Sequence, residues 1–338
     1  MSSDGRRQII APSALFGHDP PRRGGEGIYA EHMQEENARA ERKPGGSLVI
    51  GGSGLVGGYI VEHLRRHGGR VFAVSRSPRN KPGVKPDVKP DVIWLCADLR
   101  KPETLDYPAF ETLYCTADAI LLADALPQLL SPSVKRLVAF SSTSVFTKQD
   151  TEVAKERETI RKLVAAEETI AAVCEQHGVG WTILRPTLIY AEGRDTNITP
   201  LSRLIRRFGF MPLVAGAPGL RQPVHAEDLA IGAIDAAASA AAIDKFYSLP
   251  GAETISYREM IGRLFDAMKM PRRTISIPAP IWRLIFFFAR PLFPGANVAM
   301  GLRMTKDMTF DASAAIRDFG WNPRAFRPVF DQQTEINR

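Results

Sequence analysis

Cysteine is scarce in this chain of 338 residues, with only Cys96, Cys115 and Cys174. Three scattered thiols exclude a disulfide framework, and the absence of a Cys-x-x-Cys pair argues against a zinc site. We therefore predict no bound metal. A reducing compartment, the cytoplasm, is the simplest location for such a chain.

Long hydrophobic runs are also lacking. The longest apolar run near the C-terminus, 284–289, is far short of the ~20 residues that a membrane-spanning helix needs. The wider stretch 277–294 is apolar nearly all round and carries Arg283 and Arg290. It suits a helix that lies in a membrane interface as well as a core helix of a C-terminal lobe, and both interpretations stay open.

A large excess of one charge is missing, because 44 Lys and Arg against 37 Asp and Glu leave a net charge of +7. Such mild basicity fits an anionic small molecule or a membrane surface. Arg203, Arg206 and Arg207 lie near two phenylalanines, but no nucleic-acid-binding module accompanies them, so we predict no nucleic-acid partner. Residues 1–46 lack the apolar region of a signal peptide and are expected to form a disordered extension.

The strongest local motif is a glycine turn. A short apolar strand, 48–50, leads directly into Gly51, Gly54 and Gly57, and helical spacing follows. Glycines three apart between a strand and a helix allow a tight turn, close approach of the backbone to a pyrophosphate, and close helix packing. We predict a dinucleotide site here, which includes Ser53, Leu55 and Val56; the alternative is a turn that merely packs.

The remaining pattern alternates strands with helices. Strands are expected at 70–74, 92–96, 112–116, 136–141 and 181–184, and helices at 117–130 and 152–177. Three prolines within 81–92 predict an extended linker. The fold class is therefore α/β: a Rossmann-type doubly wound parallel sheet over 47–186, a smaller C-terminal α/β substrate lobe over 187–330 with an Ala-rich helix at 227–241, and a tail at 331–338.

The end of the second strand distinguishes between nicotinamide cofactors. An acidic residue there would bind a ribose 2′-hydroxyl, whereas Ser75 and Arg76 offer a hydroxyl and a guanidinium that suit a 2′-phosphate. NADP(H) is therefore favoured over NAD(H), unless Arg76 is an ordinary surface cation. Asp98 and Leu99 follow the third strand, where a carboxylate can meet the adenine amine.

Together these motifs resemble the extended short-chain dehydrogenases/reductases, and within them the NAD(P)-dependent sugar epimerase/dehydratase family. The resemblance covers about 47–330 and rests on the segments 51–57, 98–99, 140–146, 184–190, 221–230, 310–311 and 320–323. It implies hydride transfer between the cofactor and a nucleotide-linked sugar. Because some relatives act on polyprenyl-linked sugars and carry an apolar helix near 277–294, a lipid-linked substrate is a second expectation.

The resemblance also implies roles for single residues. Thr143 matches the Ser/Thr that binds the reacting sugar hydroxyl, and Arg221 matches an arginine that holds the substrate pyrophosphate. Arg303 falls near a second such position. Pro186 and Thr187 match the segment that lies against the nicotinamide and substrate. As alternatives, Thr143 could simply end a strand and Arg221 could form a surface ion pair.

One departure from the family is the missing catalytic tyrosine. The family's base is the tyrosine of Tyr-x-x-x-Lys, but no tyrosine occurs between Tyr114 and Tyr190. Thr159 and Leu163 take the two positions, with Lys162 one residue from the second. The chain is then either an enzyme whose proton leaves through Lys162, water, the substrate or the second lobe, or a non-catalytic NADP(H)-binding sensor or scaffold.

Overall fold

The computed structural model describes residues 46–76, 92–102, 107, 109–148, 151, 153–289 and 301–330, although not the side chains of 285–289. The predicted extension before residue 46, the linker 81–91 and the tail 331–338 lie outside these ranges. Outside them, too, is the end of the apolar stretch, 290–294.

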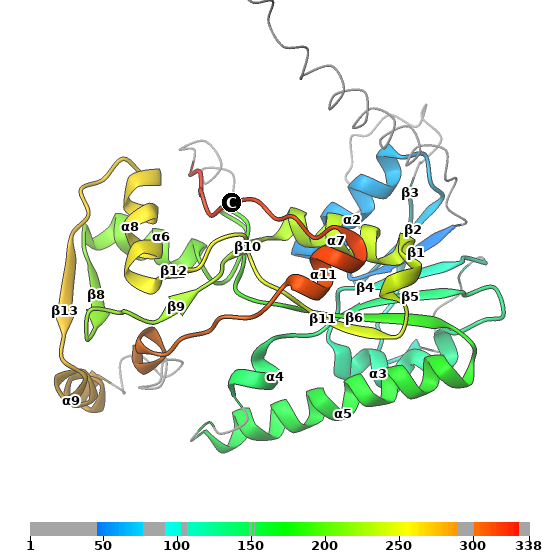
Figure 1. Cartoon of the computed structure of the whole chain (residues 1–338), viewed down its shortest axis with the longest axis horizontal. Helices are drawn as coiled ribbons and strands as arrows, with labels where there is room; N and C mark the ends of the chain where they lie inside the picture. Colours follow the sequence, from blue (N-terminus) through cyan, green and yellow to red (C-terminus); the bar gives the residue numbers. More distant parts are fainter. Residues whose placement is uncertain are drawn as a thin grey trace, which may run out of the picture. The chain divides into compact units, whose positions relative to one another are not determined.

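Seven parallel strands form the central sheet (Figure 1), in the order β11-β6-β5-β4-β1-β2-β3. The strands are β1 (Ser47–Ile50), β2 (Val71–Ser75), β3 (Val92–Cys96), β4 (Thr112–Cys115), β5 (Arg136–Phe140), β6 (Gly180–Pro186) and β11 (Lys245–Leu249). β1, β2 and β5 are buried along their whole length, as expected of a parallel sheet covered on both faces. The predicted doubly wound parallel sheet is confirmed.

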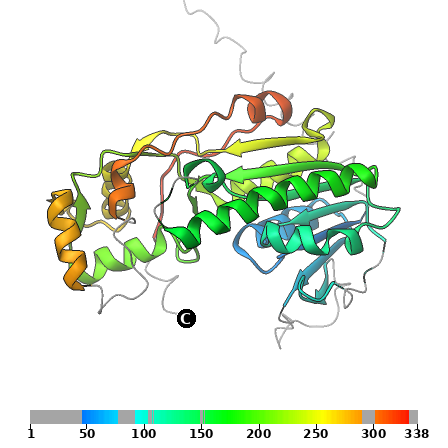
Figure 2. The ribbon, with the colours of Figure 1, turned by 90° about the horizontal axis from the view of Figure 1, so that it is seen from below.

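Helices cover both faces of this sheet. Leu48 and Ile50 pack into one core cluster with α3 (Ala119–Leu129) and α5 (Ala154–Gln176). Val49, which points the other way because strand side chains alternate, packs with α2 (Leu55–Arg66) and α7 (Ala226–Ala238). Figure 2 shows the sheet from the side that α3 and α5 cover. The Ala-rich helix expected at 227–241 is α7.

The chain returns to this sheet after leaving it. The strand β11 follows residue 186, yet it pairs with β6, with Tyr247 opposite Leu184. The helix α11 (Ser313–Phe319) then packs beside α7. The Trp321 ring lies so close to Gly232 of α7 that a Cβ added to this glycine would be only 2.5 Å from the ring. The C-terminal region therefore contributes both a strand and a covering helix to the nucleotide-binding fold.

The rest of the C-terminal half forms a separate core from short elements. Its centre is α8 (Tyr257–Ala267) packed on α6 (Thr199–Phe208), with Phe265 and Phe326 fully buried. The remaining elements of the chain, which do not all belong to this core, are α4 (Ser144–Thr147), β7 (Ile189–Tyr190), β8 (Met211–Val214), β9 (Leu220–Arg221), β10 (Val224–His225), the 3-10 helices η2 (Ala240–Ala242) and η3 (Arg303–Thr305), β12 (Ile255–Ser256), β13 (Thr274–Ile277) and α9 (Ala279–Ala289). β8 and β13 pair in parallel, whereas β9 and β12 pair antiparallel. Within the described ranges no helix is long and apolar enough to cross a membrane.

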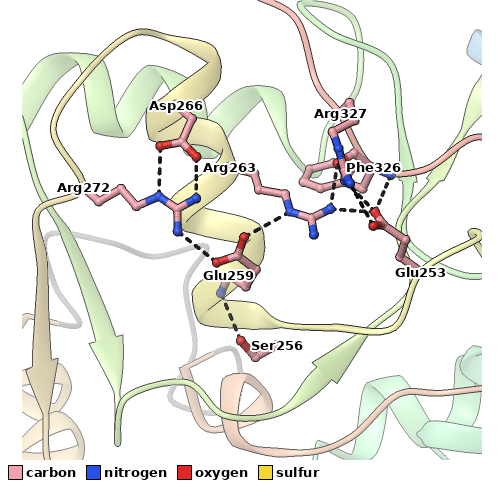
Figure 3. A network of polar contacts seen from close by, with 8 residues as sticks. All are labelled: Glu253, Ser256, Glu259, Arg263, Asp266, Arg272, Phe326 and Arg327. Atoms are coloured by element: carbon pink, nitrogen blue, oxygen red, sulfur yellow. Dashed lines mark hydrogen bonds and ion pairs between the residues drawn. The ribbon is translucent and has the colours of Figure 1, made fainter.

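An ion-pair network fixes α8 against the C-terminal segment (Figure 3). Glu253 accepts hydrogen bonds from Arg327 and Arg263, at 2.8 Å and 2.6 Å. These arginines lower the pKa of Glu253 to about 2, so its carboxylate stays charged across the physiological range. Arg263 also bonds Glu259, one turn away on α8. The network therefore holds α8 in place together with Tyr257, its first residue.

Candidate functional site

The glycine turn joins β1 to α2 with a geometry that excludes larger residues. Gly51 has a φ of +80°, in the left-handed region, and its carbonyl accepts a hydrogen bond from the Gly54 amide at 2.7 Å. A Cβ added to Gly57 would lie 2.2 Å from the Gly51 carbonyl oxygen and 2.8 Å from Thr116 Oγ1. The first and third glycines are therefore required by the backbone itself.

This turn leaves the N-terminus of α2 open to an anion. Its N-cap, Gly54, has no side chain to accept from the first-turn amides, and no acidic residue lies in the first turn. Free N–H groups at a helix N-terminus form an anion site, and the helix dipole adds a positive potential. The cradle that glycine maintains between Gly51 and Gly57 therefore fits a dinucleotide pyrophosphate over Ser53, Leu55 and Val56.

The predicted adenosine-side residues follow neighbouring strands at the same edge of the sheet. Ser75, the last residue of β2, donates a hydrogen bond to Ser53 Oγ at 2.9 Å, which links the second strand to the glycine turn. Arg76 is exposed next to it. Asp98 and the buried Leu99 follow β3, and Asp98 accepts from the Arg100 amide at 3.1 Å. The structure therefore places the residues that follow β2 and β3 at the same edge of the sheet as the glycine turn.

A cavity of about 340 Å³ opens beyond the ends of β5 and β6. Eight of its fifteen described lining residues carry a hydroxyl or an amide, and none of the fifteen is Asp or Glu. The lining comprises Ser141, Ser142, Thr143, Ser144, Thr147, Lys148, Pro186, Thr187, Leu188, Ile189, Asn197, Arg221, Gln222, Met308 and Phe310. Such a surface suits a ligand with many hydroxyl groups, because each can exchange water for a protein hydrogen bond.

Thr143 is one of the lining residues and is 7% exposed. Its hydroxyl donates to the Pro186 carbonyl at 3.0 Å, which leaves the oxygen lone pairs to accept from a ligand. The nearby Ser141 Oγ is buried, and no described residue forms a hydrogen bond with it. Thr187 also lines the cavity, and its hydroxyl donates to the Gln222 carbonyl. The lining therefore brings together Thr143, Pro186 and Thr187, three residues to which the resemblance assigns roles at the cofactor and the substrate.

The two arginines expected to hold a substrate pyrophosphate are already engaged within the chain. Arg221 lines the cavity, but it donates to the carbonyls of Leu220, Lys306 and Arg303 at 2.5–2.7 Å. Its guanidinium also lies 5.5 Å from the ring centroid of Tyr257. Arg303 does not line the cavity and forms an ion pair with Glu156. In this structure both side chains hold η3 in place.

The helix α5 contributes no residue to the cavity lining, although the resemblance places the catalytic pair on it. Lys162 is exposed, with its Nζ 3.7 Å from Glu158. Thr159 is exposed and bonds the Lys155 carbonyl at 2.9 Å, whereas Leu163 packs on the core. No tyrosine is found among the described residues that line the cavity. The cavity therefore lacks a phenol in the position of the family's base.

Sequence reasoning missed Lys148, Asn197 and Gln222. Lys148 follows α4, five residues after Thr143, and burial, together with the charge of Arg303, lowers its pKa. Gln222 donates to the Phe310 carbonyl and accepts from the Phe310 amide at 2.7 Å. The only available signal for Lys148 was its closeness to Thr143, because the local sequence resembles a polar loop. Across the described ranges, no three His, Cys, Asp or Glu side chains group as metal ligands would.

The sequence of this chain was compared with protein-family models and with known proteins. The model of the "NAD dependent epimerase/dehydratase family" matches residues 47–247. The chain is 23% identical over 260 residues to "NADH dehydrogenase (ubiquinone) 1 alpha subcomplex subunit 9, mitochondrial" of Arabidopsis thaliana, covering 70% of this chain but only 61% of that protein. It is 23% identical over 310 residues to a Vibrio cholerae UDP-glucose 4-epimerase, covering 83% of this chain and 92% of that protein.

Solved structures share the fold at low sequence identity. An epimerase from Methanothermobacter thermautotrophicus superimposes with a TM-score of 0.65 at 14% identity, covering 86% of this chain and 91% of that one. A dTDP-glucose 4,6-dehydratase from Bacillus anthracis in complex with NAD gives 0.61 at 14% identity, with 86% and 94% covered. A Thermotoga maritima UDP-glucose 4-epimerase with UDP-glucose gives 0.60 at 14% identity, with 82% and 94% covered.

Proposed function

The chain belongs to the NAD-dependent epimerase/dehydratase family, and from this premise we propose that it binds NADP(H) and acts on a nucleotide- or lipid-linked sugar by hydride transfer. One observation carries the proposal: the open α2 N-terminus follows β1, and the hydroxyl-rich cavity follows β5 and β6, in one parallel sheet. Parallel strands end at the same edge, so a dinucleotide bound at the turn can extend to the cavity.

Each of the residues at this edge of the sheet would have its own role in binding or in the reaction. The turn and the α2 amides would hold the pyrophosphate, and Pro186 would lie against the nicotinamide, whose C4 carries the hydride. Thr143 would accept a hydrogen bond from the sugar hydroxyl and so fix the reacting carbon. The family's phenol is absent from the cavity lining, so the hydroxyl proton would leave through another group, such as water, the substrate or a second-lobe side chain.

A second candidate function is a non-catalytic NADP(H)-binding sensor or scaffold. The specific observation in its favour is that α5 contributes no residue to the cavity, so the position of the usual base faces elsewhere. A single-turnover experiment separates the two functions: the protein is mixed with NADPH or NADP⁺ and a panel of nucleotide sugars, and absorbance at 340 nm is followed. Because an epimerase returns the hydride to the sugar, the sugars are also analysed for new products by chromatography. Cofactor binding with neither an absorbance change nor a new sugar product across the panel supports the sensor.

The cofactor preference gives a direct test. Loss of one charge-assisted contact to the 2′-phosphate costs about 1.5–3 kcal/mol, so Arg76→Ala is expected to weaken NADPH binding by roughly 10- to 100-fold. NADH affinity should stay the same because NADH lacks that phosphate. Calorimetric titration measures both constants. Arg66→Ala, an exposed arginine at the far end of α2, serves as the control. Equal affinity of the unmutated protein for both cofactors would contradict the preference.

For location we propose the cytoplasm, with peripheral contact to a membrane through 277–294 and a lipid-linked sugar as the corresponding substrate. The three cysteines are free thiols, as suits a reducing compartment. Ile281 and Leu284 on α9 are 50% and 59% exposed, and the exposed Arg283 lies between them. Apolar side chains beside a cation are typical of a helix that binds an anionic membrane surface.

This contact predicts that the protein sediments with anionic liposomes at low salt. Arg283→Glu should reduce the bound fraction several-fold, because it replaces attraction to the lipid headgroups with repulsion. Arg161→Glu makes the same charge change on α5 and should leave the bound fraction unchanged. Complete recovery of the intact protein in the supernatant at low salt would count against the membrane contact.

A further inference from the structure

Lys148 is a half-buried cation of the cavity. It lines the cavity with Thr143 and Thr147, and its backbone amide donates to the Ser144 carbonyl. Within the described part of the chain, no hydrogen bond or ion pair reaches its ammonium group. An ammonium removed from water without an acceptor is costly, which is why buried charges in proteins are normally paired.

The charges around Lys148 do not compensate for this burial. Glu156 is the described acidic residue whose charge raises the pKa of Lys148, but its carboxylate already accepts from Arg303 and from Thr151, at 3.0 Å in the latter case. Arg221 adds a further positive charge to the lining, and none of the described lining residues is acidic. Burial first and Arg303 second lower the pKa of Lys148, while Glu156 opposes them. Among the described residues, the lining of the cavity therefore has two cations, Lys148 and Arg221, and no anion.

A second unsatisfied group lies in the same cavity. Ser141 Oγ is buried and finds no hydrogen-bond partner among the described residues, although nearly all buried polar atoms in proteins have one. Ser142, in contrast, bonds Ser144 at 3.0 Å, and Thr143 bonds the Pro186 carbonyl. An unpaired hydroxyl and an unpaired ammonium together indicate a ligand that carries both hydroxyl groups and a negative charge.

We infer that the cavity takes a nucleotide sugar whose hexose bears a carboxylate, and that Lys148 binds this carboxylate. The inference rests on the proposed function, because it assumes that the sugar occupies the cavity beside Thr143. The arginines that would otherwise meet an anion are held by carbonyls and by Glu156, which leaves Lys148 as the cation available to the ligand. The lysine thus selects acidic sugars over neutral ones.

Calorimetric titration of the full chain, saturated with NADPH, tests this selectivity. UDP-glucuronate is expected to bind roughly 10- to 100-fold more tightly than UDP-glucose, the range of one charge-assisted hydrogen bond. Lys148→Met should remove this difference and leave UDP-glucose affinity unchanged within about twofold. Lys148→Arg keeps the charge and should retain most of the preference. Lys155→Met, an exposed lysine on α5 outside the lining, is the matched control.

Each contrary result has a separate meaning. Equal affinity of the unmutated protein for the two sugars overturns the inference without any variant, so a poorly folded Lys148→Met protein does not prevent the test. Equal weakening of UDP-glucose and UDP-glucuronate by Lys148→Met also overturns it, because the lysine would then bind the diphosphate. If NADPH binds but neither sugar does, the proposed sugar function itself fails, and this inference fails with it.

Discussion

Replacing Gly57 by alanine is expected to abolish measurable dinucleotide binding. The new Cβ would lie 2.2 Å from the Gly51 carbonyl oxygen and 2.8 Å from Thr116 Oγ1, far inside contact distance. The atoms nearest to it belong to backbone and to a short side chain bonded to the Ile50 carbonyl at 3.2 Å, so they cannot simply move away. We expect the first turn of α2 to shift and the pyrophosphate cradle to be lost.

The expected magnitudes follow from this overlap. Overpacking in a buried position costs about 1–3 kcal/mol of stability, and loss of the anion site should lower NADPH affinity by at least roughly 100-fold. Urea denaturation and calorimetric titration measure the two effects. Gly58→Ala is the matched control, because its Cβ would meet the nearest atom, the Gly52 carbonyl oxygen, at an ordinary 3.7 Å. NADPH binding by Gly57→Ala that equals that of Gly58→Ala would show that the turn does not hold the cofactor.

The second large effect is expected at Thr143. In Thr143→Val the Pro186 carbonyl keeps the Thr143 amide as a donor at 3.2 Å, so the fold should be retained. The sugar hydroxyl, however, loses the group that orients it. Misplaced reacting groups commonly cost about 10²-fold in rate, so we expect hydride transfer to fall by about that factor. NADPH affinity should change by less than about twofold.

Turnover followed at 340 nm and NADPH titration separate these two readouts. Thr169→Val removes a hydroxyl that also donates to a backbone carbonyl, at 2.8 Å, but on the exposed face of α5. That variant should behave as the unmutated protein. Turnover that is indifferent to Thr143→Val would contradict the assignment of the sugar hydroxyl, while the cofactor assignment would remain.

The nucleotide-binding part of the fold could be predicted because its signals are local. A strand that runs into Gly51, Gly54 and Gly57 and then a helix specifies one turn geometry, and the structure shows the steric reason at Gly57. The pairing of β11 with β6 could not be predicted from such patterns. The sequence of a five-residue strand does not specify which strand it pairs with, and β6 lies about 60 residues before β11 in the sequence.

The site was predictable only in part, because local sequence patterns do not reveal contacts between distant segments. Thr143 lies directly after a buried strand, so its position at the sheet edge follows from local structure. The engagement of Arg221 by carbonyls of residues 303 and 306 depends on packing between distant segments. The pKa of Lys148 depends in the same way on the charges of the distant Arg303 and of Glu156, besides its burial. Long-range contacts of this kind decide whether a cation is free for a ligand, and no spacing rule reveals them.

A crystal structure with bound NADPH would show whether one dinucleotide extends from the glycine turn to the hydroxyl-rich cavity. We expect the pyrophosphate at the N-terminus of α2, the 2′-phosphate beside Ser75 and Arg76, and the nicotinamide C4 facing the cavity next to Thr143. A cofactor bound away from the turn, or a nicotinamide ring directed away from Thr143, would contradict this expectation.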